Sequence, residues 1–117
     1  MQIPQDHKVN AKIALGRVMA PLAFWSFEPK EIEKGLPDKV LIEAVLLHGN
    51  DPLRKRLLGI FDLSEIKKVW EERLIIQGPR LQILNRKIAK DIFGISDPSE
   101  FIRRSYRKHN LYARFSE

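Results

Sequence analysis

Apolar residues recur at intervals of three and four along most of this sequence, and this spacing limits what the chain can fold into. Leu84, Ile88 and Ile92, for example, fall on one side of a helix with 3.6 residues per turn. A β-strand would need alternating apolar and polar residues, and the sequence shows no such signal. The spacing therefore predicts an all-α fold.

Prolines and glycines divide this pattern into short segments. Asp51-Pro52 places a helix-capping side chain before a residue suited to the first helical turn, whereas Gly49 and Gly78 favour helix ends. We expect a single compact bundle of five to six short helices. The predicted helices span residues 11–19, 37–48, 52–61, 64–74, 79–93 and 98–109.

The expected bundle has a central helix and loose ends. The segment 37–48 is apolar nearly all round, which is typical of a helix surrounded by others. We expect Asn10 to cap the first helix after a flexible arm at 1–10, and Pro21 to end it, because proline lacks an amide hydrogen. Residues 110–117 are expected to form a tail that packs back on the bundle.

Length and composition favour one soluble domain over residues 1–117. The absence of cysteine excludes disulfides, thiolate zinc sites and a cysteine nucleophile, so we expect no metal or other cofactor and place the chain in the cytoplasm. The longest apolar run, at 40–47, is interrupted by Glu43 and falls short of the roughly 20 residues that span a bilayer. No membrane association is expected.

The formal charge is +6, and the excess lies in the second half. Residues 1–51 hold six Lys/Arg and seven Asp/Glu, residues 52–96 hold ten and five, and residues 97–117 hold five and three. A surplus of cations attracts acidic partners. This distribution predicts that nucleic acid or an acidic protein approaches the second half.

Two groups of cations are the candidate binding residues. On a helix, the four at 103–108 would form a stripe opposite Phe101, Ile102 and Tyr106, which are expected to be buried. The alternative is a pair of solvated helix faces with no partner. The candidates are Arg103, Arg104, Arg107, Lys108, Arg86, Lys87 and Lys90.

The succession of helices at 52–61, 64–74 and 79–93 is compatible with a helix-turn-helix, which would read DNA with outward polar side chains. Gln82 and Arg86, followed at the same spacing by Lys90, supply that chemistry on the third helix. The alternative is an ordinary bundle, in which short helix pairs are common.

Arg104 and His109 are separated by four residues, a spacing that resembles the ribonuclease motif of HEPN domains. This resemblance implies that His109 is a general acid or base and that Arg104 stabilises charge developing on phosphorus. The alternative is a chance match within a basic segment.

Phe24 and Trp25 lie with Phe27 in a segment expected to be a loop. Such a cluster either closes one end of the bundle or anchors a partner, because aromatic residues are enriched among interface hot spots. A homodimer is therefore among the assemblies that the sequence allows.

Several short motifs between residues 22 and 96 carry a family resemblance. They are Phe24-Trp25, Leu41-Ile42-Glu43, His48-Gly49-Asn50-Asp51, Ile66-Lys67-Lys68-Val69 and the segment 88–95. The chain resembles a family of small helical prokaryotic domains of unassigned biochemistry, often found beside nucleotidyltransferase-type abortive-infection toxins. The resemblance implies an antitoxin-like role in which the protein binds the toxin, DNA or both, and it implies no catalytic residue.

These observations together predict a binding module rather than an enzyme. The expected role is antitoxin-like or regulatory, with the basic C-terminal half contacting an acidic protein, DNA or RNA. The two alternatives are a helix-turn-helix protein that reads DNA sequence and a HEPN-type ribonuclease that uses Arg104 and His109.

Overall fold

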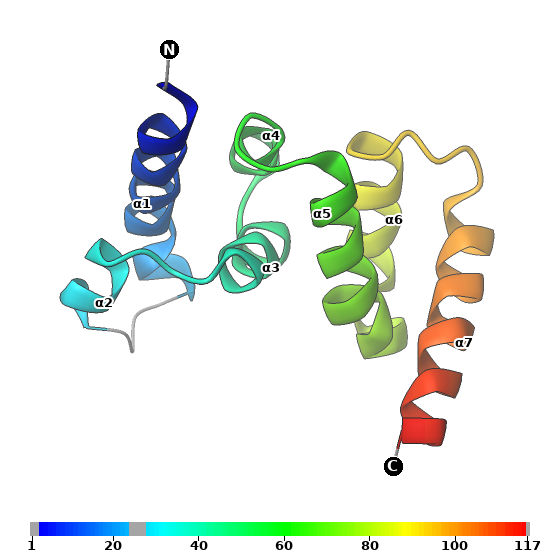
Figure 1. The fold of residues 1–117 in the computed structure, drawn as a ribbon. Helices are drawn as coiled ribbons and strands as arrows, with labels where there is room; N and C mark the ends of the chain where they lie inside the picture. Colours follow the sequence, from blue (N-terminus) through cyan, green and yellow to red (C-terminus); the bar gives the residue numbers. More distant parts are fainter. Residues whose placement is uncertain (1–2, 24–27, 117) are drawn as a thin grey trace. The chain divides into compact units, whose positions relative to one another are not determined.

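The computed structural model describes residues 3–23 and 28–116, and in these ranges it contains helices and no strand (Figure 1). The predicted all-α fold is confirmed. The elements are α1 (Ile3–Ala23), α2 (Pro29–Glu33), α3 (Asp38–His48), α4 (Asp51–Leu58), α5 (Leu63–Val69), a π-helical turn η1 (Trp70–Leu74), a 3₁₀ segment η2 (Ile75–Leu81), α6 (Gln82–Asp91) and α7 (Pro98–Ser116).

These elements form two compact units, Met1–Phe61 and Asp62–Glu117, which we call unit 1 and unit 2. Unit 1 holds α1 to α4, and unit 2 holds α5 to α7 with the turns η1 and η2. Each unit is described by itself below, and a single domain over residues 1–117 stays a prediction.

In unit 1, α3 packs against both α1 and α4, as expected of a helix that is apolar nearly all round. Its Leu41, Val45 and Leu46 are almost fully buried, as are Leu15 and Met19 of α1. Burial of such side chains contributes about 1.5–3 kcal/mol each. The core of this unit therefore lies along α3.

Polar contacts fix how the helices of unit 1 follow one another. The Asn50 side chain accepts a hydrogen bond from the Leu53 amide at 3.0 Å, so Asn50, rather than the expected Asp51, caps α4. Arg54 of α4 donates hydrogen bonds to the carbonyl oxygens of Leu46 at 3.1 Å and Gly49 at 3.0 Å. These donors satisfy carbonyls that the end of α3 leaves without helical partners.

The expected limits of the first helix were wrong. Residues 3–10 form the first turns of α1 instead of an arm, so Asn10 lies inside the helix, and Pro21 also lies inside it. Pro21 cannot donate to the carbonyl of Arg17, so α1 lacks one backbone hydrogen bond there, yet it continues for two more residues to Ala23. The missing bond does not end the helix at Pro21.

The expected tail at 110–117 was also wrong, because α7 continues to Ser116. No proline or glycine follows Pro98 in the sequence, so nothing in the backbone chemistry ends the helix near His109. Side chains are described only up to His109 in this helix.

In unit 2, α5 runs directly into η1 and η2, and the chain turns sharply at Gly78. Gly78 has a φ of +78°, a left-handed conformation that side-chain-bearing residues seldom adopt. The predicted break between the segments 64–74 and 79–93 lies here. After the turn, α6 packs against η2, and α7 packs against α6, η1 and η2.

Trp70 forms the centre of unit 2 and is fully buried. Its ring stacks on Phe93, with centroids 4.9 Å apart, and on Phe101, with centroids 5.6 Å apart. The indole Nε1 donates a hydrogen bond to Asn85 Oδ1 at 3.0 Å, and Asn85 Nδ2 donates to the Leu74 carbonyl at 3.4 Å. The buried polar atoms of this core are therefore paired, as native interiors require.

Candidate functional site

The cations of α7 are held outward by a buried residue between them. Ser105 is only 5% exposed, and its Oγ donates a hydrogen bond to Glu71 Oε1 of η1 at 2.8 Å. Arg103 and Arg107 lie two positions either side of Ser105, which places them on the opposite face of the helix. Both are exposed, as are Arg104 and the neighbouring Lys108.

Glu100 partly neutralises the start of this basic face. Arg103 Nη2 lies 2.5 Å from Glu100 Oε2, and Arg104 Nε lies 3.0 Å from Glu100 Oε1. The hydrogen bond from Arg103, followed by that from Arg104, holds the pKa of the Glu100 carboxyl below its usual value. One carboxylate facing two guanidinium groups leaves one positive charge, and exposed pairs of this kind form and open at little cost.

The cations of α6 are exposed for a similar reason. Asn85 and Ile88 are buried on one face of α6, so Arg86, Lys87 and Lys90 lie on the solvent side. Lys87 Nζ pairs with Asp91 at 3.2 Å. The predicted outward direction of this face is confirmed.

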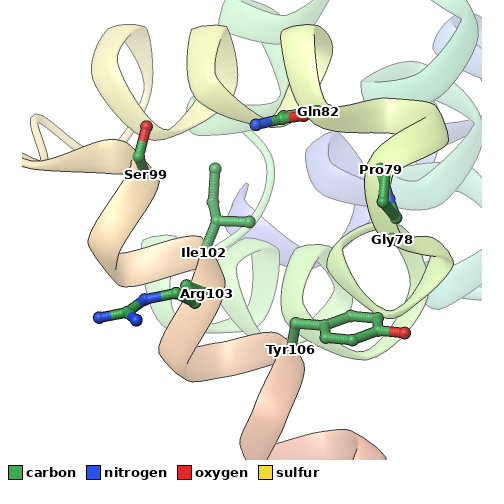
Figure 2. A pocket seen from close by; sticks show the side chains of 7 residues that line it. All are labelled: Gly78, Pro79, Gln82, Ser99, Ile102, Arg103 and Tyr106. Atoms are coloured by element: carbon green, nitrogen blue, oxygen red, sulfur yellow. The ribbon is translucent and has the colours of Figure 1, made fainter.

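A groove of about 340 Å³ lies between the start of α6 and the first turns of α7, both in unit 2 (Figure 2). Its interior is mainly apolar, with polar side chains at the rim. In Figure 2 the Tyr106 ring lies at one side of the groove and Gln82 at the other. The lining residues are Gly78, Pro79, Gln82, Ser99, Ile102, Arg103 and Tyr106.

Tyr106 was expected to be buried, and that expectation was wrong. It is 37% exposed and lines the groove, whereas Ser105 takes the buried position beside it. A Cβ atom added at Gly78 would lie 3.5 Å from Tyr106 Cε2, so the ring packs close to the glycine backbone. A Cβ atom at that distance would make an ordinary van der Waals contact, so the turn requires glycine because of its φ of +78° rather than for lack of space.

Arg104 and His109 are not brought together in this chain. His109 lies five positions after Arg104, which places the two residues about 140° apart around α7. The Arg104 side chain is 78% exposed beside Glu100, whereas His109 is 25% exposed with its Nε2 4.0 Å from Glu71 Oε1. This separation follows from the spacing of the motif on any helix, so it does not test the ribonuclease interpretation, which stays a prediction.

Two other interpretations of the sequence stay predictions. Phe24 and Trp25 lie outside the described residues, so the partner anchor stays a prediction. The proposed helix-turn-helix combines α4 of unit 1 with α5 of unit 2, and it also stays a prediction, although Gln82 is exposed on α6 together with the cations of that helix.

Two further findings concern the described part of the chain. Within it, no three histidine, aspartate or glutamate side chains are grouped closely enough to hold a metal ion. None of its helices combines the length and the apolar character needed to cross a bilayer.

The sequence reasoning missed the groove as a site. Gly78-Pro79 was interpreted only as a helix break, and Ser99 was given no role. No local signal marked it, because the groove forms only where α7 packs beside the turn at Gly78 and the start of α6. The hydrogen bond between Ser105 and Glu71 joins positions 34 residues apart and has no local signal.

Comparisons with protein-family models, with curated proteins and with solved structures gave no match. The resemblance to the toxin-associated helical family therefore stays a prediction, and the site has to be interpreted from its own chemistry.

Proposed function

We propose that this protein is a non-enzymatic binding module whose second unit binds an acidic macromolecule. The observation that carries this proposal is the exposure of every predicted cation on α6 and α7, two helices that pack against each other. These cations are Arg86, Lys87, Lys90, Arg103, Arg104, Arg107 and Lys108.

The ion pairs within unit 2 involve only some of these cations and leave the others available to bind an anion. Arg103 and Arg104 share one carboxylate, and Lys87 pairs with Asp91. Among the described side chains, no ion pair involves Arg86, Lys90, Arg107 or Lys108. When exposed cations of this kind bind a polyanion, they displace the counterions condensed on it. The affinity therefore depends strongly on the salt concentration.

The proposed biological role is antitoxin-like or regulatory, with a nucleotidyltransferase-type toxin as one candidate partner. This part of the proposal is supported only by the family resemblance of residues 22–96. It is tested by co-expression with such a toxin, followed by purification of the pair through a tag on the toxin.

A charge-balanced pair of variants tests the binding proposal. The first variant replaces Arg86, Lys90, Arg107 and Lys108 with glutamine. The control replaces four exposed cations of unit 1 with glutamine and so lowers the formal charge by the same amount. The control residues are Lys34, Lys39, Lys55 and Arg56.

Binding to heparin, to nucleic acids and to an acidic polypeptide is then measured at several salt concentrations. We expect the unit 2 variant to lose most of its affinity and to show a salt slope shallower by about 0.7–0.9 per lost phosphate contact, while the control keeps both. Equal losses in the two variants would show that net charge alone drives binding and would refute the assignment to α6 and α7.

A second candidate function, reading of DNA sequence, is favoured by one observation. Gln82, Arg86 and Lys90 are all exposed on α6 at four-residue spacing, as a helix in the major groove requires. Selection of duplexes from a random pool tests it, because a reading helix enriches a defined motif and a sequence-blind surface does not.

A further inference from the structure

We propose that the groove between the start of α6 and α7 receives a base of a single-stranded nucleic acid, which stacks on Tyr106. This inference rests on the proposed function, because it names the macromolecule that the basic surface of unit 2 binds. Residues of η2, α6 and α7 form the groove, and all of them belong to unit 2.

The size and lining of the groove fit one flat ring. Its volume of about 340 Å³ lies at the small end of the range for ligand sites, roughly 300–1,000 Å³. Pro79 and Ile102 provide apolar walls, and the Tyr106 ring provides an aromatic one. Nucleic-acid bases stack on such rings whatever their sequence, because every base has a π-face.

Tyr106 lies beside the turn at Gly78. A Cβ atom added to this glycine would be 3.5 Å from Tyr106 Cε2, and 37% of the residue is exposed. A side chain that packs beside a neighbouring turn on one side and is open on another loses little conformational freedom when a ligand stacks on it. Tyr106 is therefore suited to be a fixed platform.

The polar side chains at the rim match the edge of a base. Gln82 lies across the groove from Tyr106 in Figure 2, and its amide offers both a donor and an acceptor. Ser99 adds a hydroxyl that can donate or accept. A base seated on Tyr106 would thus meet hydrogen-bonding groups rather than an apolar lid.

Cations continue from the groove along both helices. Arg103 lines the groove, and Arg107 follows one turn later on α7, about 6 Å along the axis. On α6, Arg86 follows Gln82 by one turn in the same way. Phosphates on either side of a seated base could therefore be neutralised, with Glu100 giving up its pairing to Arg103 as the strand binds.

This combination favours a single strand over the other acidic partners. A nucleotide brings a flat ring and a negative charge together, whereas an acidic peptide brings carboxylates without a ring. A duplex keeps its bases stacked and paired, so a base could enter the groove only after it had left its stack and its partner, which costs free energy.

The test uses the full-length protein and fluorescence anisotropy with short labelled oligonucleotides. Four probes are compared: a single strand, an abasic strand with the same number of phosphates, the matching duplex and an acidic polypeptide. Stacking of one base predicts that the ordinary strand binds about 5- to 150-fold more tightly than the abasic strand.

Variants locate that preference in the groove. Tyr106→Ala should abolish the preference for the ordinary strand over the abasic one, whereas Tyr106→Phe should keep it. Ile83→Ala is the matched control, because Ile83 is 85% exposed on α6 and does not line the groove. If Tyr106→Ala does not fold, Ser99→Leu serves instead, since it fills the groove from an exposed position with an aliphatic side chain and removes no packed atoms.

The outcomes separate the two proposals. Equal binding of ordinary and abasic strands, a preference unchanged in Tyr106→Ala or Ser99→Leu, or tighter binding of duplex or polypeptide would each overturn the base-binding groove while the basic surface stands. Failure to bind any polyanion, heparin included, would overturn the proposed function itself.

Discussion

Replacing Asn85 with leucine should destabilise unit 2, even though it puts an apolar residue into an apolar core. Both Asn85 and Trp70 are fully buried, and the hydrogen bond between Trp70 Nε1 and Asn85 Oδ1 is 3.0 Å long. Leucine has a similar size but offers no acceptor, so the indole N–H would remain buried without a partner. An unpaired buried donor costs about 1–3 kcal/mol.

A double-mutant cycle separates this cost from changes in packing. Trp70→Phe removes the N–H group together with part of the ring that stacks on Phe93 and Phe101. In the Trp70→Phe background no indole donor remains, so Asn85→Leu should cost less, or even stabilise the protein. We expect a coupling free energy of about 1–2 kcal/mol between the two positions.

The assay is urea unfolding of the four proteins followed by far-UV circular dichroism, with the slope against urea checked for each. A shift of the midpoint at constant slope reports a change in stability. The reasoning would be refuted if Asn85→Leu were as stable as the wild type, or if its cost were the same with tryptophan and with phenylalanine at position 70.

Three further outcomes are expected. Gly78→Ala should lower stability by about 1–2 kcal/mol in thermal or urea unfolding because of the φ of +78°, whereas Gly59→Ala, at a φ of −87°, should be neutral or mildly stabilising. Because the pKa of Glu100 is lowered in the folded protein, its charged form contributes stability that is present above about pH 4.5 and is lost as the pH falls through the folded-state pKa. In urea unfolding at several pH values, the free energy of unfolding of a Glu100→Gln variant should therefore change less with pH than that of the wild type. RNA incubated with the protein should stay intact, with no difference between wild type, Arg104→Ala and His109→Ala on a denaturing gel; cleavage lost in either variant would contradict the non-enzymatic assignment.

The sequence predicted the helices well and some of their ends poorly. Apolar spacing reports which face of a segment is buried, which is why the outward direction of Arg86 and Lys90 was correct. Apolar spacing carries less information about helix ends, and Pro21 shows that one missing amide hydrogen did not end α1 where expected.

The groove could not be predicted for a different reason. Whether Tyr106 is buried or lines a surface depends on how α7 meets the turn at Gly78, and these positions are far apart in the sequence. The pairing of Asn85 with Trp70 is of the same kind, since a polar residue at an apolar position gives no indication of its distant partner. Such contacts are set by tertiary packing, which local periodicity does not record.

Arg54 shows that formal charge and available charge differ in this protein. It is one of the ten basic residues at 52–96, yet its guanidinium group is committed to two carbonyl oxygens at the end of α3 and to Asp51, and only 11% of the side chain is exposed. An anion approaching the molecule would meet fewer cations than the composition indicates. Electrostatic attraction should therefore follow the distribution of uncommitted side chains more closely than the isoelectric point.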